Sequence, residues 1–324
     1  MYEEYFGLGN LPFELTADPK YLFLGPKQRE ALSTLQYGLF GGKSITAIFG
    51  EAGTGKTTLI RAALASERCR KVRCVYLDNP VFDPDDFVRM LALKFEIGTD
   101  VPISKPVFLT RLEAMLVDRR ARGEITALVV DEAQSLSTAL LEELRLLANI
   151  ETPGGKLLPL VLAGQPELAQ RLESHELRQL KQRIVLRCEL VPFGLPETAS
   201  YIAKRLEVAS GLATQLFTQG AVMLIHEYSG GLPRTINVVC DNALLCAMAL
   251  GQPRVDERMV VEVCGDLKLK ARPGGRLAAL LALRRRNDKT TAASGWSSRV
   301  EFPIGLSLWR RWCRFVGQLA GSGR

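Results

Sequence analysis

Short apolar runs alternate with longer amphipathic runs from about residue 44 to residue 192. The apolar runs are five or six residues long and rich in β-branched side chains, as expected of strands buried on both faces of a sheet. They cover residues 44–49, 72–77, 125–130 and 158–162. The amphipathic runs between them, such as residues 138–150, have the length of helices. This alternation predicts an α/β fold with a parallel sheet and helices on both faces.

Beyond Pro196 the strand pattern stops and helical runs follow, over about residues 197–210, 218–229 and 234–250. Pro196 suits the first turn of a helix, and Gly230-Gly231 before Pro233 is a strong helix stop. These patterns divide the chain into an N-terminal segment, an αβα core, a small helical lid and a tail, at residues 1–30, 31–192, 193–267 and 268–324.

Positive charge is concentrated in the tail. From Lys268 onward there are 13 Lys and Arg against two acidic residues, Asp288 and Glu301, which is a local balance of +11. The net charge of the whole chain is +7, so residues 1–267 carry −4. The body of the protein is therefore mildly acidic, and an electrostatic partner is expected first at the tail.

The composition indicates the cellular compartment of the protein and limits the kinds of metal site that it can hold. The seven cysteines show no CxxC spacing, and we interpret them as reduced, mostly packed thiols. The two histidines are isolated, which argues against a metal site built on histidine. We see neither a signal-peptide pattern nor an apolar run of the roughly 18–20 residues that span a bilayer. A cytoplasmic protein is therefore expected.

A phosphate-loop pattern occupies residues 50–57, which read GEAGTGKT. It lies between an apolar run and a helix-forming run, so bound phosphates would meet backbone N–H groups at a helix N-terminus. In this pattern Lys56 reaches the β- and γ-phosphates and the hydroxyl of Thr57 ligates Mg²⁺. The loop therefore predicts binding of ATP with Mg²⁺. The expected binding residues are Gly50, Glu51, Ala52, Gly53, Thr54, Gly55, Lys56, Thr57 and Thr58.

Two carboxylates, Asp131 and Glu132, follow the apolar run 125–130. At the carboxyl end of a parallel strand they would face the same crevice as the triphosphate. Asp131 is expected to hold Mg²⁺ through its water shell, and Glu132 to polarise the attacking water. An Asp-Glu pair also caps helices, so the phosphate loop is what favours the catalytic interpretation.

Together the two motifs and the helical lid resemble the AAA+ ATPases. The resemblance implies a polar sensor of the γ-phosphate just after the run 158–162, where Gln165 stands, although most members have Asn, Ser or Thr there. It also implies a second sensor, Arg234, which follows Gly230-Gly231 and starts a helix of the lid. A solvated arginine is the alternative for Arg234, but a helix dipole disfavours positive charge at a helix start.

Residues 180–184, LKQRI, resemble the AAA+ segment that supplies an arginine finger to a neighbouring subunit. Arg183 is the first candidate and Arg178 the second, and helix-surface charge is the alternative for both. Such an arginine stabilises charge on the transferring phosphate and is worth roughly 10³–10⁵ in rate. The resemblance thus implies a homo-oligomer, either a ring or a filament.

The chain is more closely similar to the ExeA-like, or general secretion pathway protein A, family of AAA+ ATPases. The similarity covers about residues 1–266 and rests on YFGL at 5–8, PFELTADP at 12–19, YLFL at 21–24, GQPEL at 164–168 and GGLPRTIN at 230–237. In that family the N-terminal segment lies against the adenine, which makes Tyr21, Leu22 and Phe23 candidate base contacts. Simple core packing is the alternative for these three. Asn79 matches the position where many AAA+ enzymes restrain the catalytic glutamate.

The secretion-pathway member continues into a membrane-spanning segment and a peptidoglycan-binding domain, which we do not find in this sequence. Cell-wall binding is therefore not expected. The tail instead carries an amphipathic pattern at residues 306–320, LSLWRRWCRFVGQLA. At about 100° per residue its apolar side chains share one face and its arginines the other, which suits the interface of an anionic membrane. This would place the protein peripherally on the inner face of the membrane; docking on protein and binding of nucleic acid are the alternatives.

The leading hypothesis is an AAA+ ATPase that binds and hydrolyses ATP with Mg²⁺ at a subunit interface and couples nucleotide state to assembly of a secretion or cell-envelope system. The alternative is an ATP-dependent DNA-binding regulator of the transposition or replication type. The basic residues at 119–122, RRAR, and the tail support that alternative. A helix C-terminus that carries basic side chains is the other interpretation of RRAR. A third hypothesis is a nucleotide-gated scaffold that does not hydrolyse ATP, against which Glu132 and the finger candidates weigh.

Overall fold

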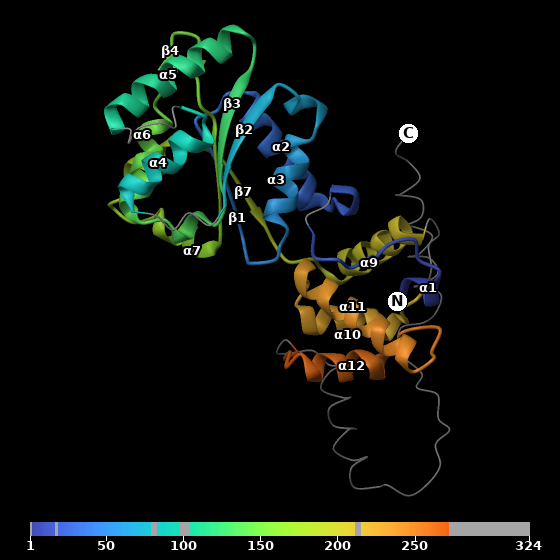
Figure 1. Ribbon diagram of the computed structural model, residues 1–324. Helices are drawn as coiled ribbons and strands as arrows, with labels where there is room; N and C mark the ends of the chain where they lie inside the picture. The colour runs from blue at the N-terminus through green and yellow to red at the C-terminus, as the bar shows by residue number, and fades with distance from the viewer. Residues whose placement is uncertain (1, 17–18, 79–82, 98–103, 211–214, 272–324) are drawn as a thin grey trace, which may run out of the picture. The chain divides into compact units, whose positions relative to one another are not determined.

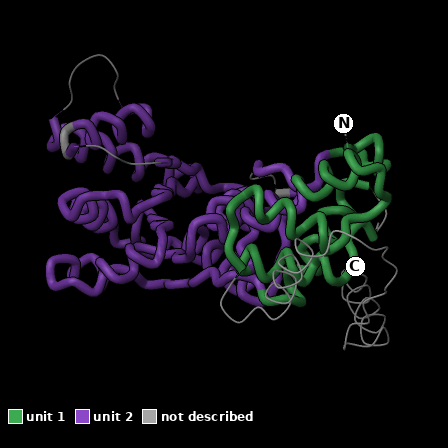
Figure 2. Tube along the Cα trace, turned by 90° about the horizontal axis from the view of Figure 1, so that it is seen from below, with its two compact units in different colours: residues 1–10, 194–230, 242–324 green, residues 11–193, 231–241 purple. Residues whose placement is uncertain are grey.

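The computed structural model describes residues 2–16, 19–78, 83–97, 104–210 and 215–271 (Figure 1). These residues form two compact units, which Figure 2 draws in different colours. Within the described ranges, the sheet unit contains the residues of 11–193 and 231–241, and the helical unit contains those of 2–10, 194–230 and 242–271. The chain crosses between the two units four times.

The units divide the chain differently from the sequence-based boundaries at two places. Residues 1–10 of the expected N-terminal segment belong to the helical unit, where the N–H of Gly9 donates to the carbonyl of Ala209 at 2.7 Å. Residues 231–241, expected in the lid, belong to the sheet unit, where the N–H of Phe193 donates to the carbonyl of Gly231 at 2.8 Å. The segment that carries Arg234 is therefore part of the unit that carries the phosphate loop.

Five parallel strands form the sheet, in the order β2-β3-β6-β1-β7. They are β1 (Ile45–Gly50), β2 (Val72–Leu77), β3 (Ile125–Val130), β6 (Leu160–Gly164) and β7 (Ile184–Leu190). The predicted parallel sheet is confirmed, and β7 is an additional strand that the apolar pattern did not predict. Because β7 is an edge strand, it alternates exposed Arg187 and Glu189 with buried Cys188 and Leu190 instead of forming a continuous apolar run.

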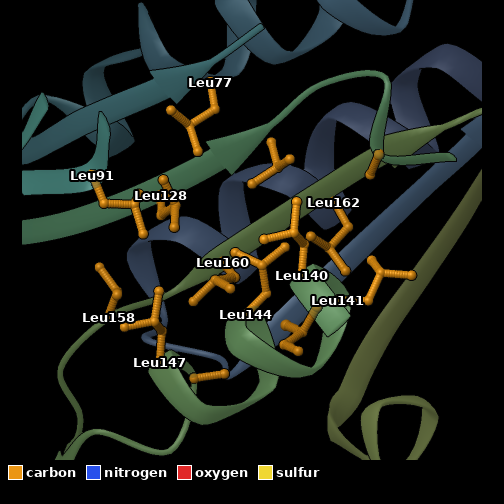
Figure 3. Close-up of a cluster of buried hydrophobic side chains, with 14 of the residues drawn as sticks. Leu77, Leu91, Leu128, Leu140, Leu141, Leu144, Leu147, Leu158, Leu160 and Leu162 are labelled. Carbon is orange, nitrogen blue, oxygen red and sulfur yellow. The ribbon is translucent and has the colours of Figure 1, made fainter. Parts of the chain in front are cut away.

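Helices cover both faces of the sheet, as Figure 1 shows. They are α2 (Pro26–Phe40) and α3 (Lys56–Leu64) on one face, and α4 (Pro84–Lys94), α5 (Lys105–Ala121) and α6 (Thr138–Leu147) on the other. Successive strand residues face opposite layers, so Leu128 packs with α4–α6 and Val129 with α2 and α3. Figure 3 shows the first of these cores, which is rich in leucine. Burial on both faces explains the continuous apolar runs of the central strands.

Short elements complete the sheet unit. They are η1 (Pro19–Tyr21), η2 (Glu67–Cys69), η3 (Ala133–Ser135), β4 (Glu151–Thr152), β5 (Gly155–Lys156), α7 (Pro166–Arg171) and α8 (Arg178–Arg183). The phosphate loop, η3 and the start of α7 follow β1, β3 and β6, whose carboxyl ends meet at one edge of the sheet. The topology thus gathers the candidate residues of three separate motifs at that edge.

The helical unit contains α1 (Tyr2–Phe6), α9 (Leu195–Ser210), α10 (Gln219–Ser229), the C-terminal part of α11 (Pro233–Ala249) and α12 (Glu257–Asp266). Helix α10 packs against α9 and α12. Gly230 ends α10 with a left-handed backbone (φ 60°), as the helix stop predicts. The pattern did not predict α12, whose signal is Asp256: its carboxylate accepts the N–H groups of Arg258 and Met259 at 3.0 and 3.1 Å.

The cysteines within the described ranges are free thiols, and Cys69, Cys188, Cys240 and Cys264 are buried. Burial raises the pKa of Cys188 and of Cys264 to about 12, so both stay protonated and pack as small apolar groups. No helix among the described residues combines the length and apolar character needed to cross a bilayer.

Candidate functional site

The phosphate loop connects the end of β1 to the start of α3, and its glycines are required either by a close contact or by a left-handed backbone. A Cβ at Gly50 would lie 2.8 Å from both the carbonyl oxygen of Leu190 and the hydroxyl of Thr54. Gly55 has a left-handed backbone (φ 95°) and is the N-cap of α3. The loop therefore wraps tightly and opens into a helix N-terminus, where backbone N–H groups favour an anion.

Lys56 is buried, with 5% of its surface exposed, and is held by the loop that it follows. Its Nζ donates to the carbonyls of Gly50 and Glu51 at 2.8 and 3.2 Å. Burial lowers the pKa of Lys56, and the charges of Glu132, Asp131 and Glu167 oppose that shift. The ammonium group is thus positioned where the loop folds around it, and the charges of three carboxylates act on it.

Asp131 is buried at the end of β3 and accepts three hydrogen bonds. Oδ2 accepts from the hydroxyl of Thr57 at 2.6 Å and from the hydroxyl of Tyr76 at 2.7 Å, and Oδ1 accepts from the backbone N–H of Glu132 at 3.0 Å. Burial and the neighbouring Asp131 raise the pKa of Tyr76 well above its ordinary value, so its hydroxyl keeps the proton that it donates. The structure therefore brings Thr57 and Asp131 together.

This pair fits a magnesium ion. Mg²⁺ prefers oxygen ligands and usually takes one or two of them from protein, with phosphates and water completing the shell. The hydroxyl of Thr57 and the carboxylate of Asp131 supply two oxygens beside the phosphate loop. Sequence reasoning missed Tyr76, because its contact with Asp131 depends on β2 lying next to β3 in the sheet.

Glu132 follows Asp131 with a left-handed backbone (φ 53°), which costs a residue other than glycine about 1–3 kcal/mol. Its Oε2 accepts the side-chain amide of Gln165 at 3.2 Å and also the side-chain amide of Gln134. The side-chain carbonyl of Gln134 accepts the backbone N–H of Gln165 at 3.0 Å. The structure thus joins the predicted Glu132 and Gln165 through Gln134, a residue that the sequence did not single out.

Arg171, on α7, holds the loop that contains Gln134. Its Nη1 donates to the carbonyl oxygens of Gln134 and Leu136 at 2.7 and 2.8 Å. We found no sequence signal for this role, because Arg171 reads as an ordinary charge on a short helix. The contact ties the residues after β3 to the helix after β6.

Arg234 lies against the phosphate loop within the sheet unit. Its backbone N–H donates to the carbonyl of Gly53 at 3.2 Å, and a Cβ added to Gly53 would lie 2.7 Å from Cβ of Arg234. The side chain of Arg234 is exposed. The second-sensor candidate thus starts α11 beside the loop that would hold the phosphates.

The finger candidates lie away from the phosphate loop of their own chain. Arg183 ends α8 and precedes Ile184, which pairs with Ile45 at the start of β1, whereas the phosphate loop follows the end of β1. The pKa of Glu151 is lowered first by Lys156 and to a smaller extent by Arg183, so the charge of Arg183 acts near the β4–β5 hairpin. Arg178, at the other end of α8, is exposed.

The candidate base contacts pack within the sheet unit. Tyr21 is buried and its hydroxyl donates to the carbonyl of Leu11 at 3.2 Å. Leu22 packs against the core under α2 and α3, and the ring of Phe23 meets that of Phe193 edge-on at 5.3 Å. Because η1 packs against α3, Tyr21 lies near the helix that follows the phosphate loop. Two expectations lie outside the described residues: Asn79, and the tail with its amphipathic run at 306–320.

Known proteins resemble this chain in sequence and in fold. Residues 40–172 match the family model of the AAA domain. Over 271 residues the chain is 38% identical to general secretion pathway protein A of Aeromonas hydrophila, covering 84% of this chain and 48% of that protein. The chain therefore spans about half the length of that relative.

Among the solved structures that match, two examples have low sequence identity to this chain. The Cdc6p of Pyrobaculum aerophilum has a TM-score of 0.60 at 16% identity, covering 85% of this chain and 89% of that one. The ORC2 protein of Aeropyrum pernix, in its ADPNP-ADP complexes, has a TM-score of 0.58 at 16% identity, covering 95% and 89%. At this identity the matches establish the fold alone.

The fold is that of AAA+ P-loop proteins, a parallel sheet between helices with a helical portion following it. Residues 40–172 are the part of the chain that matches the AAA-domain model. Within that class, the match to general secretion pathway protein A confirms the resemblance to the ExeA-like family that the sequence motifs imply.

Proposed function

We propose that this chain binds ATP with Mg²⁺ and hydrolyses it. One observation carries the proposal: Lys56, the Thr57–Asp131 pair and the Glu132–Gln165 pair come from three separate segments and meet at one edge of the sheet. Structural packing alone does not require a buried ammonium group beside two carboxylates, and charged groups of this kind are costly to bury unless they serve a site.

Each residue has a role that follows from its atoms. Lys56 exchanges the carbonyls of Gly50 and Glu51 for phosphate oxygens when ATP binds. The Thr57 hydroxyl and the Asp131 carboxylate hold the magnesium ion, which neutralises charge on the triphosphate when bound. Tyr76 keeps Asp131 oriented through the hydrogen bond to Oδ2.

Glu132 accepts a proton from the attacking water. The water oxygen forms a bond to the γ-phosphorus, the bond to the bridging oxygen breaks, and its electron pair leaves with ADP. Gln165 and Arg234 contact the γ-phosphate, and Arg183 of a neighbouring subunit reaches the same group in a ring or filament. Most of the catalysis then lies in positioning and in stabilising charge, as in other phosphoryl transfers.

The proposed cellular role is to couple nucleotide state to assembly of a secretion or cell-envelope system. The name of the Aeromonas relative, a general secretion pathway protein, supports this role. In this proposal the protein works as a homo-oligomer, meets envelope or secretion proteins as partners, and lies peripherally on the inner face of the membrane.

The test of hydrolysis is Glu132→Gln. This change keeps the shape and removes the proton acceptor, so ATP affinity should stay within about twofold while turnover falls at least ~10²-fold. Nucleotide binding by fluorescence titration and phosphate release by a coupled assay measure the two effects.

The matched control is Glu167→Gln, which neutralises an exposed carboxylate whose charge also acts on Lys56. It should hydrolyse ATP at the wild-type rate. Wild-type turnover in Glu132→Gln would refute the catalytic assignment.

A second function, ATP-dependent binding of DNA, is favoured by a basic groove. The groove has a volume of 310 Å³ and is lined by Arg70, Lys71, Arg73, Arg122, Gly123 and Glu124. Residues 67–73 and 118–124 together hold seven basic and three acidic residues, a balance of +4 within a body (residues 1–267) of −4. Such segregation of positive charge on an acidic body is typical of a surface that meets phosphates.

This alternative is tested by charge reversal in the groove. In the double variant Arg70→Glu, Lys71→Glu, the affinity for a short labelled duplex should fall, and the slope of log affinity against log salt should weaken by about 2 between roughly 50 and 200 mM salt. The control is Lys204→Glu, Arg258→Glu, which makes the same charge change at exposed sites of the helical unit. Equal affinity of both variants would remove the groove from consideration.

A further inference from the structure

Gln134 connects Glu132 and Gln165, the two residues that the proposed function places beside the γ-phosphate. Its side-chain amide donates to Oε2 of Glu132, and its side-chain carbonyl accepts the backbone N–H of Gln165 at 3.0 Å. The side-chain amide of Gln165 donates to the same Oε2 at 3.2 Å. The three residues therefore close a ring of hydrogen bonds between the end of β3 and the end of β6.

The orientation of the Gln134 amide follows from the chemistry of its neighbours. A backbone N–H can only donate, so the atom of Gln134 that faces Gln165 has to be the carbonyl oxygen. The amide nitrogen then faces Glu132, whose ionised carboxylate can only accept. This position therefore needs an acceptor and a donor on one side chain, which a glutamine supplies in a single orientation.

The surrounding contacts fix Gln134 in this place. Arg171 holds its backbone carbonyl at 2.7 Å. Gly164, at the end of β6, has no side chain, and a Cβ there would lie 3.2 Å from Oε1 of Gln134 and 2.5 Å from the side chain of Leu168. The side chain of Gln134 thus fills a space bounded by β6 and α7, and it has little freedom to turn away from Glu132.

We propose that Gln134 is a positioning residue that keeps the carboxylate of Glu132 oriented while Gln165 engages the γ-phosphate. This inference rests on the proposed ATPase function. Oε2 of Glu132 has two amide donors, and one of them, Gln165, leaves when its amide turns toward phosphate. Gln134 remains as the donor to Oε2, so the carboxylate of Glu132 keeps its orientation toward the attacking water.

The same ring also couples the two residues. Because the carbonyl of Gln134 is bonded to the backbone of Gln165, a shift at the end of β6 changes the donor that Glu132 receives. A change at Gln165 on binding of a γ-phosphate thereby alters the hydrogen bond to Glu132, the residue that accepts the proton. If Gln134 had a purely structural role, only its side-chain carbonyl would be needed. Loss of the N–H donor to Glu132 would then leave kcat unchanged.

Two variants separate these roles. Gln134→Met has a similar length and removes both hydrogen bonds, whereas Gln134→Glu keeps an acceptor for Gln165 and replaces the donor to Glu132 by a carboxylate. We expect kcat to fall about 10- to 100-fold in both variants, because a carboxylate that is off by a fraction of an ångström loses its alignment. KM for ATP should stay within about twofold in both. The matched control, Gln170→Met, changes an exposed glutamine of α7 and should keep wild-type kinetics.

Wild-type kcat in Gln134→Glu would overturn the positioning role, and so would a rise in KM with kcat unchanged. Amide hydrogen exchange of Gln165, measured by NMR without nucleotide, tests the hydrogen-bond link independently of turnover. Exchange should become faster in Gln134→Met and stay slow in Gln134→Glu, and unchanged exchange in the Met variant would disprove the link.

Including Glu132→Gln in the same assays separates this inference from the proposed function. If Glu132→Gln hydrolyses ATP like the wild type, the catalytic assignment fails and the positioning role fails with it. If Glu132→Gln is inactive while Gln134→Met and Gln134→Glu are fully active, the proposed function stands and Gln134 alone is refuted.

Discussion

Asp131 receives more hydrogen bonds than a helix cap or a surface carboxylate would need. Two hydroxyls, from Thr57 and Tyr76, meet at its Oδ2, and a carboxylate oxygen accommodates both because it carries two lone pairs. If Thr57 turns toward a bound magnesium ion, Tyr76 is the hydroxyl that still orients the carboxylate. The residue that would align this proposed metal ligand is therefore on β2, the neighbouring strand.

This leads to a prediction for Tyr76→Phe, which removes one hydroxyl and keeps the ring. A hydrogen bond to a charged group is worth about 1.5–3 kcal/mol, so the Mg²⁺ concentration for half-maximal ATPase activity should rise about tenfold. ATP affinity measured without Mg²⁺ should not change. A magnesium titration of turnover measures the effect, with the exposed Tyr37→Phe as the matched control. An unaltered magnesium requirement would show that Tyr76 only packs.

At the scale of elements, the start of α11 packs on the phosphate loop. The backbone of Arg234 is bonded to Gly53, and the two residues are so close that only a hydrogen atom fits in place of the Gly53 side chain. Two loop glycines have a left-handed backbone, Gly53 with φ 83° and Gly55 with φ 95°. A Cβ at Gly55 would meet no heavy atom within 4 Å. Substitutions at Gly53 and Gly55 therefore both strain the backbone, but only the one at Gly53 also creates a steric contact.

Both alanine variants should therefore be destabilised, and Gly53→Ala more than Gly55→Ala. Each substitution strains the backbone by about 1–2 kcal/mol, and Gly53→Ala adds the cost of overpacking against α11, about 1–3 kcal/mol. Urea unfolding of the nucleotide-free protein compares the two. An equal loss of unfolding free energy in the two variants would mean that α11 moves away from the phosphate loop without an energetic cost.

At the scale of the molecule, the sheet separates Arg183 from the phosphate loop of its own chain. Arg183 precedes β7 beside Ile45 at the start of β1, and the phosphate loop begins at Gly50, the end of β1, five residues further. At about 3.3 Å per residue this is roughly 17 Å along the sheet, more than an arginine side chain spans. If Arg183 contacts a γ-phosphate, that phosphate belongs to another subunit.

Mixing two inactive variants tests this assembly. Arg183→Ala should lose about 10³-fold in turnover by itself, and it should regain activity when mixed with Glu132→Gln subunits. The mixed interface combines the intact Arg183 of one subunit with the intact Glu132 of the other. Activity is measured by phosphate release across mixing ratios, with Arg178→Ala in a parallel series. Failure of every ratio to restore turnover would argue against a shared site.

The sequence by itself determined the class of fold and the linear motifs. Continuous apolar runs predicted the central strands because those strands are buried on both faces, and residues 50–57 identified the phosphate loop because glycine and lysine spacing reflects local backbone geometry. The place of Asp131 and Glu132 after a strand predicted that they face the phosphate loop, and the resemblance to the AAA+ ATPases implied Gln165 as a sensor. The edge strand β7 and helix α12 were missed, because an edge strand alternates charge with apolar residues and α12 depends on a single cap.

Only the tertiary structure decided which side chains meet. Tyr76 reaches Asp131 because β2 lies beside β3, Gln134 joins Glu132 to Gln165 because β3 lies beside β6, and Arg171 holds the same loop from α7. Each contact spans at least one strand boundary, and a linear pattern does not encode the order of strands in a sheet. Strand order and register, set by packing of the two apolar layers, therefore supplied the residues that position the site.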